Sequence, residues 1–195
     1  MIRAIVFDLD GVLRHFDSKS IDEIEQRHNL AHGAIHSTAF STPLLGMVTT
    51  GAITRREWVE QVGEQIGNSQ AAVEWSKLRP SVDGEVLELV DELRTSDFAT
   101  AILTNGTDEV PYELHSQGIA PHFDHIFNSA EIGVAKPEPE VFDFVLRVLD
   151  LPADSVFFAD DSASKLTGAH TRGIHTHHFR DIAGLRRALR DVNVI

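Results

Sequence analysis

The sequence predicts an α/β fold in which a doubly wound parallel sheet carries helices on both faces and a helical insertion follows the first strand. Two observations support this prediction. Short apolar runs alternate with amphipathic helical patterns along most of the chain, whereas the stretch from about Ser18 to Pro80 is helical throughout, with no clear strand. The 195 residues suffice for one α/β domain with a sizeable core and a modest insertion.

The strands of the sheet are predicted by four short apolar runs. The first run opens the stretch IRAIVFDLDG, from Ile2 to Gly11, and the other three are residues 98–104, 125–129 and 155–160. These runs are short and rich in β-branched and aromatic residues, and helical patterns separate them, which is typical of buried parallel strands. A weaker strand is expected around residues 173–179.

Amphipathic helices are expected between these strands. Residues 82–96 place Leu87, Val90 and Leu93 at helical spacing, and residues 136–151 show the same pattern after a proline-containing start. A last helix is expected over residues 181–192. Together the elements form a βαβ series, so the fold class is α/β with a doubly wound, Rossmann-like parallel sheet.

The region that interrupts this alternation is interpreted as a small all-helical cap. Residues 21–30, 56–66 and 71–78 each have helical periodicity. We therefore expect a catalytic core of residues 1–17 and 81–195, and a cap domain of residues 18–80. Because an open α/β sheet binds ligands at the carboxyl ends of its strands, an insertion at that edge would cover the site and hold its specificity.

The composition excludes several classes of protein. The net charge of −13 argues against nucleic acid or an anionic membrane as a partner. The absence of cysteine excludes disulfides, a thiolate nucleophile and a cysteine-based zinc site. No signal peptide and no membrane span is apparent, so we expect a cytoplasmic protein.

Polar side chains follow several of the expected strands. Because parallel strands share one carboxyl edge, these groups should converge there. Several carboxylates cannot stay ionised together without a cation, and oxygen ligands suit Mg²⁺. The set comprises Asp8 and Asp10 after the first strand, Thr104, Asn105 and Gly106 after the second, Asp160 and Asp161 after the fourth, and Lys136 ahead of a helix.

These residues resemble a known family. The stretches DLDGVL, LTNGT, the lysine of AKPEPEVF and FFADDSASKLTGAHTRGI, in this order and spacing, are similar to the four motifs of the haloacid dehalogenase superfamily. The resemblance runs from Ile2 to about Phe179, and the helical caps of that superfamily lie after its first motif.

The resemblance implies a role for each motif residue. Asp8 would be the nucleophile that forms an aspartyl-phosphate, and Asp10 would protonate the leaving alkoxide and then activate water. Thr104 and the amides around Asn105 and Gly106 would bind the phosphoryl oxygens, and Lys136 would offset negative charge.

The resemblance also implies a metal site. Mg²⁺ would bind the Asp8 side chain, the Asp10 main-chain carbonyl and Asp161, with Asp160 close by as an outer or water-mediated ligand.

Arg14, in the linker toward the cap, is either a substrate contact or part of a solvated hinge.

One position departs from the family pattern. Lys165 stands four residues after Asp161, where family members commonly carry Asn, Asp or Gly. Its ammonium either reaches the acidic cluster and competes with the metal, or points to solvent.

The expected function is that of a Mg²⁺-dependent phosphatase acting on a small soluble phosphomonoester such as a sugar phosphate. A phosphotransferase of the β-phosphoglucomutase type would share every core residue, and a catalytically weak binding or regulatory protein could use the same scaffold. We expect a monomer or a weak homodimer that contacts neither nucleic acid nor membranes.

Overall fold

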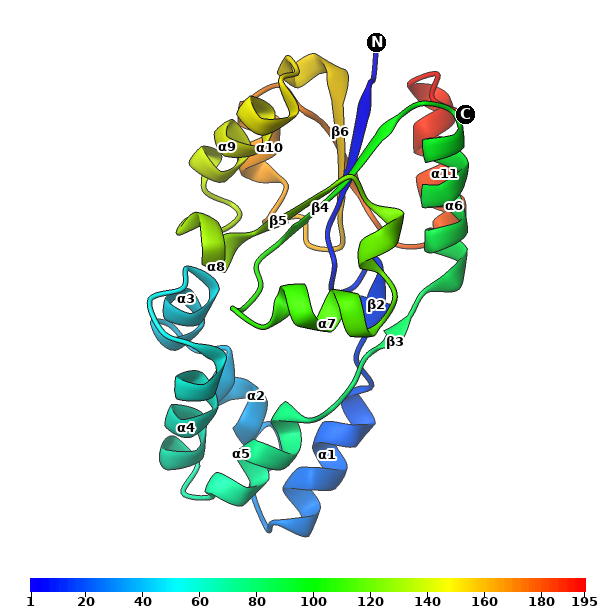
Figure 1. Cartoon of the computed structure of the whole chain (residues 1–195). Helices are drawn as coiled ribbons and strands as arrows, with labels where there is room; N and C mark the ends of the chain where they lie inside the picture. Colours follow the sequence, from blue (N-terminus) through cyan, green and yellow to red (C-terminus); the bar gives the residue numbers. More distant parts are fainter.

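The computed structural model covers residues 1–195 and places five parallel strands in one central sheet (Figure 1). After β1, the next two strands of this sheet are added on one side of it, and the last two are added on its other side. The direction of winding therefore reverses at β1. The predicted doubly wound α/β fold is confirmed. The spatial order is β5-β4-β1-β6-β7, with β1 (Ala4–Phe7), β4 (Ala99–Thr104), β5 (His125–Asn128), β6 (Val156–Asp160) and β7 (His175–His178).

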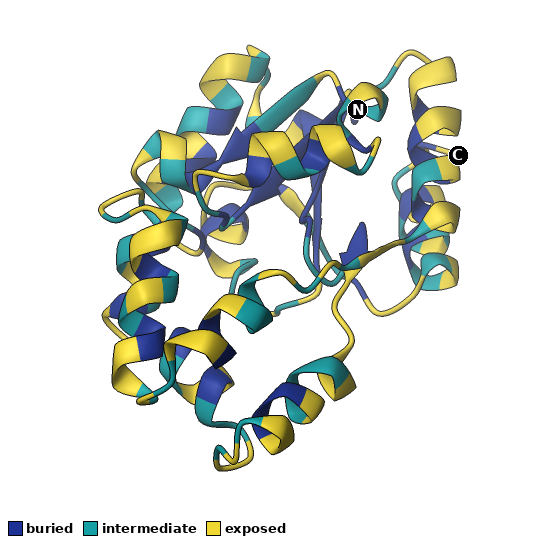
Figure 2. Cartoon of the chain, turned by 60° about the horizontal axis from the view of Figure 1, so that its bottom comes forward, coloured by how far each residue is buried: buried dark blue, intermediate teal, exposed yellow.

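The period-2 alternation of the strands divides the core between the two faces of the sheet. Ile5 and Phe7 of β1 pack in an apolar cluster with α6 (Gly84–Thr95), α7 (Val110–Ser116) and α11 (Ile182–Asp191). The intervening residues Ala4 and Val6 pack instead with α9 (Pro139–Leu149) and α10 (Thr167–Thr171). Figure 2 shows the buried residues concentrated on the strands, between helices whose outward sides are exposed.

Short elements complete the core. They are the helix α8 (Ser129–Ile132), which directly follows β5, and the 3-10 turns η1 (Ala120–His122) and η2 (Ala153–Ser155).

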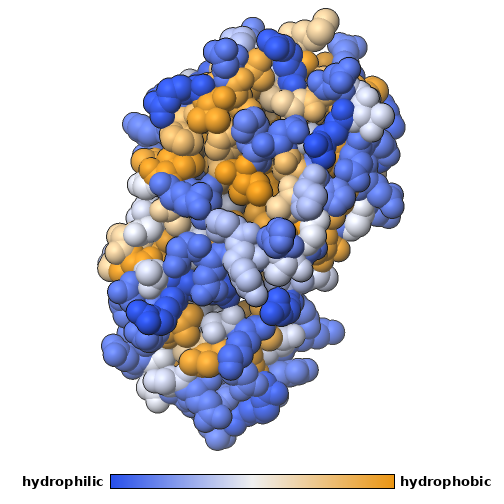
Figure 3. Space-filling model, in the orientation of Figure 1, coloured by the Kyte–Doolittle hydropathy of each residue, from blue (hydrophilic) through white to orange (hydrophobic).

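No helix of the chain combines the length and the apolar character needed to cross a membrane. Hydrophilic side chains dominate the face of the molecule seen in Figure 3, and apolar ones gather mainly over its sheet-bearing part.

The helical insertion (residues 18–80) leaves and rejoins the core through a two-stranded antiparallel ribbon. In this ribbon β2 (Arg14–His15) pairs with β3 (Ser81–Val82). The only regular elements between the two strands are helices, and they bury apolar clusters of their own around Trp58 and Ile24. These helices are α1 (Ser18–Arg27), α2 (Ala34–Ala39), α3 (Leu44–Thr49), α4 (Arg55–Gln65) and α5 (Ser69–Ser76).

The helical insertion rests against the segments that follow β4 and β5. The Ser129 hydroxyl, directly after β5, donates to the Thr49 carbonyl at 2.5 Å. The Arg55 amide, at the start of α4, donates to the Asp108 carboxylate at 2.7 Å. Since these segments follow the carboxyl ends of their strands, the insertion lies over the edge of the sheet where the sequence predicts the functional groups.

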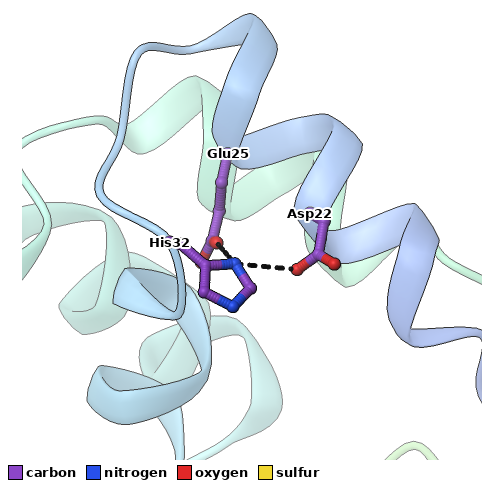
Figure 4. A group of neighbouring side chains, drawn as sticks. All are labelled: Asp22, Glu25 and His32. Carbon is purple, nitrogen blue, oxygen red and sulfur yellow. Dashed lines mark ion pairs between the residues drawn. The ribbon is translucent and has the colours of Figure 1, made fainter.

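A buried glutamate organises the first turn between the insertion helices. Glu25, on α1, is 1% exposed, and its two carboxylate oxygens accept hydrogen bonds from the amides of Gly33 (2.7 Å) and Ile35 (2.8 Å) at the start of α2. His32 lies 3.2 Å from Asp22 and 3.9 Å from Glu25 (Figure 4). Because Glu25 satisfies the free amides of a helix start, its role is structural.

Glu25→Ala should lower the free energy of unfolding by about 2–4 kcal/mol, because two amides lose a charged hydrogen-bond acceptor. Denaturant unfolding followed by circular dichroism measures this loss. Glu23→Ala is the matched control, since Glu23 is exposed on the same helix. Equal stability of the two variants would contradict the structural role of Glu25.

Candidate active site

Three of the predicted site residues meet at the centre of the sheet edge. Asp8 directly follows β1, Thr104 ends β4 and Asp160 ends β6. Because β4 and β6 pair with β1 on its two sides, the topology brings the three together. All three are buried, with exposures of 1% or less.

The Lys136 ammonium lies between the two buried carboxylates. Its Nζ atom is 2.8 Å from Asp8 Oδ1 and 2.7 Å from Asp160 Oδ2, and it also donates to the Leu103 carbonyl at 2.8 Å. The side chain is fully buried. Two hydrogen bonds and the ion pair with Asp8 therefore hold the charge of Lys136 in a fixed position.

The Asn105 side chain fixes the main chain of Lys136. Its Nδ2 donates to the Lys136 carbonyl at 2.7 Å, and its Oδ1 accepts from the Lys136 amide at 2.8 Å. This reciprocal pair ties the segment after β4 to the segment before α9. The Asn105 side chain is therefore used in positioning Lys136. Gly106, the next residue, has no room for a Cβ atom, because Val110 and Asn128 lie too close to it.

The two buried carboxyl groups respond differently to their surroundings. Burial alone would raise the pKa of Asp8, but the ammonium groups of Lys136 and Lys165 outweigh this effect and hold that pKa below its ordinary value. Burial raises the pKa of Asp160 to about 6, with Lys136 opposing the rise and Asp8 adding to it. Asp8 is thus kept ionised, as a nucleophilic carboxylate must be.

Asp10 lies at the more open side of the site and is held by Arg14. Arg14 Nε is 2.6 Å from Asp10 Oδ1, and the Arg14 side chain is 3% exposed against 42% for Asp10. Burial raises the pKa of Asp10 above its ordinary value, and the Arg14 guanidinium offsets only part of the rise. Of the two interpretations of Arg14, the solvated hinge is wrong, because the side chain is buried and tied to the site.

Glu113 connects this pair to the helical insertion. On α7, its Oε2 accepts from Arg14 Nη1 at 2.9 Å, while its Oε1 accepts from Arg55 Nη1 on α4 of the insertion. Arg55 also donates to Glu109 at 3.1 Å. Sequence reasoning did not find Glu113, because it lies 99 residues from Arg14 and belongs to no motif.

Asp161 approaches the first motif at Gly11. The backbone of Gly11 has a φ of +93°, and a Cβ atom built there would lie 2.3 Å from Asp161 Oδ2. Carboxylate oxygens of Asp8, Asp160 and Asp161 lie within 4.8 Å of one another. This oxygen-only donor set fits Mg²⁺, and the absence of a Cβ at Gly11 makes room for one of its members.

Lys165 points inward, which is one of the two orientations that the sequence left open. Its Nζ is 3.2 Å from Asp8 Oδ2, and the side chain is 31% exposed. Both oxygens of Asp8 thus face an ammonium. Burial would lower the pKa of Lys165, but Asp8 and Asp160 together raise it, so the side chain is charged.

A cavity of about 340 Å³ opens from this edge toward the helical insertion. Asp10, Arg14, Asn105 and Gly106 line it on the core side. The rest of the wall comes from the ribbon, from the segment after β4 and from helices of the insertion. Groups from both parts of the chain therefore surround one space beside the carboxylates.

The chain matches the haloacid dehalogenase-like hydrolase family over residues 2–171. It belongs to that family. The motifs singled out in the sequence, from Asp8 through Lys136 to Asp161, all fall inside the matched region, so the predicted relationship is confirmed.

Known proteins similar to this hydrolase include phosphatases. It is 27% identical to bifunctional epoxide hydrolase 2 of Rattus norvegicus over 98% of the chain, which spans only 39% of that relative. It is 25% identical to D-ribitol-5-phosphate phosphatase of Bacteroides thetaiotaomicron over 97% of both chains.

Among solved structures, the fold is similar to that of the HAD family enzyme bt-2542 from Bacteroides thetaiotaomicron, in a complex with magnesium and inorganic phosphate. The TM-score is 0.79 at 23% identity, covering 95% of this chain and 99% of the other. This similarity extends over the core and the helical insertion together.

Gly11→Ala should destabilise the hydrolase by about 2–4 kcal/mol, because alanine is strained at positive φ and its Cβ would collide with Asp161. Gly118→Ala is the matched control, because Gly118 has a φ of +71° and a Cβ atom added there would have no neighbour within 4 Å. A urea titration gives the free energy of unfolding of each variant. The difference between the two losses measures the collision with Asp161, because both variants share the strain at positive φ. An equal loss in both would mean that Asp161 does not need the space at Gly11.

Proposed function

We propose that this hydrolase is a phosphatase that cleaves phosphomonoesters through an aspartyl-phosphate on Asp8. The observation that carries the proposal is a buried carboxylate kept ionised by Lys136 and Lys165, with the second carboxylate of Asp10 close by on the same loop. The similarity to a D-ribitol-5-phosphate phosphatase along nearly the whole chain supports it.

Mg²⁺ is the proposed cofactor. Asp8, the main-chain carbonyl of Asp10 and Asp161 would hold it, with Asp160 behind them, and the similar enzyme bt-2542 has been solved with magnesium and phosphate. When bound, the ion would neutralise charge on the phosphoryl oxygens. The clustered carboxylates are the feature of this chain that supports such an ion.

The reaction divides between the two carboxylates of the first motif. An oxygen of Asp8 forms a bond to phosphorus as the bond from phosphorus to the substrate alcohol breaks. Asp10 gives its proton to the departing alkoxide, and then takes a proton from the water that hydrolyses the aspartyl-phosphate. Burial shifts the pKa of Asp10 upward against the effect of the Arg14 guanidinium, which is the direction that proton donation in the first step requires.

Fixed positive charge stabilises the phosphoryl group during transfer. Lys136 is already placed against Asp8 and cannot move without breaking this ion pair and two hydrogen bonds. The Thr104 side chain and the main-chain amides near Asn105 are the proposed donors to the phosphoryl oxygens. Lys136 is held in place before a substrate binds, so its charge needs little reorganisation during the reaction.

The helical insertion is the proposed cap of this site, covering residues 18–80. It lies over the carboxyl edge of the sheet and walls the cavity beside Asp10. A cap in this position excludes water from the phosphoryl group and contacts the alcohol portion of the substrate.

Asp8→Asn should keep the fold and reduce Mg²⁺-dependent hydrolysis of p-nitrophenyl phosphate by at least about 10⁴-fold, because an amide is a poor nucleophile at phosphorus. Release of p-nitrophenolate measures the rate. Asp191→Asn, an exposed position on α11, removes the same charge far from the site and serves as control.

Near wild-type hydrolysis by Asp8→Asn would refute the covalent mechanism. Absence of hydrolysis by the wild-type protein at every Mg²⁺ concentration would favour a binding protein over a phosphatase. Isomerisation of a sugar phosphate that depends on a bisphosphate would identify a phosphotransferase.

Lys165→Asn should tighten Mg²⁺ binding several-fold, because the variant removes an ammonium that competes with the ion for Asp8. Calorimetry with Mg²⁺ at low and moderate salt measures the affinity, and the gain should shrink with salt. Lys77→Asn removes an exposed ammonium at the end of α5 and controls for net charge. Weaker binding in Lys165→Asn would mean that Lys165 organises the acidic cluster instead of opposing the metal.

A further inference from the structure

We propose that the substrate of this hydrolase is the phosphate ester of an apolar alcohol and not of a polyol or sugar. The inference rests on the proposed phosphatase function and concerns the cavity between Asp10 and the helical insertion. It departs from the sugar phosphate expected from the sequence. The chemistry of the cavity wall supports it in three ways.

The first support is the composition of the wall. Ten of the 21 lining residues are hydrophobic. They come from the linker, from four helices of the insertion and the residues that follow two of its helices, and from α7 of the core, so apolar surface surrounds the space on several sides. They include Phe16, Phe40, Leu45, Trp58, Trp75 and Val110.

Three aromatic side chains of the wall, Phe40, Trp58 and Trp75, pack against one another in a row. Trp58 lies edge-on to Phe40 at 6.1 Å and to Trp75 at 5.0 Å between ring centroids. Phe16 and Phe40 are 48% and 44% exposed although they are large and apolar. Apolar surface left open next to a cavity is typical of a binding site for an apolar group.

The second support is that most polar side chains of the wall have their partners within the protein; in the insertion, Ser18 and His36 are the exceptions. In the insertion, the Thr49 hydroxyl donates to the Leu45 carbonyl at 2.8 Å, and the Ser76 hydroxyl donates to the Val73 carbonyl at 2.9 Å. The Trp58 indole donates to the Ala39 carbonyl at 3.0 Å. None of these donors is free for a substrate hydroxyl.

The charged groups of the wall are paired as well. The Arg55 guanidinium bonds to Glu109, to Glu113 and to the Ser76 carbonyl. Arg14 bonds to Asp10 and Glu113. A polyol entering this space would lose hydrogen bonds to water and find few replacements, whereas an alkyl or aromatic group loses none.

The third support is the position of the cavity. Asp10, the proposed proton donor to the leaving alcohol, lies in its wall together with Asn105 and Gly106. A phosphoryl group at Asp8 would therefore direct its alcohol into the apolar space. The volume of about 340 Å³ lies in the range of pockets that enclose small organic ligands.

The test compares two substrates with the same carbon chain, hexyl phosphate and sorbitol 6-phosphate, by release of inorganic phosphate in Mg²⁺. The wild-type kcat/KM should be about 10–100-fold higher for hexyl phosphate, the range over which an apolar pocket discriminates. Equal values, or a preference for sorbitol 6-phosphate, would overturn the inference while the phosphatase function stood.

A pair of variants locates the preference in the cavity. Phe40→Gln should lower the ratio of kcat/KM for hexyl phosphate to kcat/KM for sorbitol 6-phosphate by about 5–10-fold, because it puts an amide into the apolar wall. Val73→Gln is the matched control, since Val73 is also 44% exposed on the insertion but does not line the cavity. An equal change of the ratio in both variants would contradict the assignment of the cavity.

Binding separates the inference from the proposed function. Calorimetry on Asp8→Asn with the same two phosphates needs no turnover, and hexyl phosphate should bind at least about tenfold more tightly. If no phosphate ester were hydrolysed but this difference remained, the phosphatase function would fail and the apolar pocket would stand. Equal affinities would overturn the inference whatever the activity.

Discussion

The buried ammonium of Lys136 between Asp8 and Asp160 is the interaction on which the rest of the site depends. One cation, 2.8 Å and 2.7 Å from two carboxylates, joins the ends of β1 and β6 to the segment before α9. Burying these charges costs desolvation, and an unpaired buried charge costs about 3–5 kcal/mol. The pairing therefore keeps both carboxylates inside the protein, and Asn105 keeps the lysine in place from the neighbouring segment.

The second constraint is the order of the strands. Because the winding of the sheet reverses at β1, the strands on both sides of Asp8 deliver groups to it, Thr104 from β4 and Asp160 from β6. The same edge receives the helical insertion, which is tied to the core through Ser129, Asp108 and Glu113. Glu113 joins Arg14, and through it Asp10, to Arg55 of the insertion. The contact that holds the insertion thus extends to the proposed acid–base group.

The two sides of the site have opposite chemical character. On the core side, Asp8 and Asp160 form ion pairs with Lys136 and Lys165 around the point where a phosphoryl group would bind. On the side of the insertion, apolar and aromatic side chains line much of the space, and the polar groups of Thr49, Arg55 and Trp58 are paired within the protein. In the proposed phosphatase, recognition of phosphate and of the alcohol would therefore rest on different physical effects, electrostatic on one side and hydrophobic on the other.

The sequence by itself determined the strands, the doubly wound sheet and the identity of the motif residues, because apolar periodicity and the polar residues at strand ends are local signals. It also located the helical insertion, but not the ribbon that carries it. Only the tertiary structure decided which partners these residues have: Asn105 holds a lysine, Arg14 is buried against Asp10 and Glu113, and Lys165 points to Asp8. Such pairings join residues as far apart as 157 positions, and the apolar cavity wall is assembled from several separate segments and helices. No pattern along the chain records these distances, because they follow from how the elements pack.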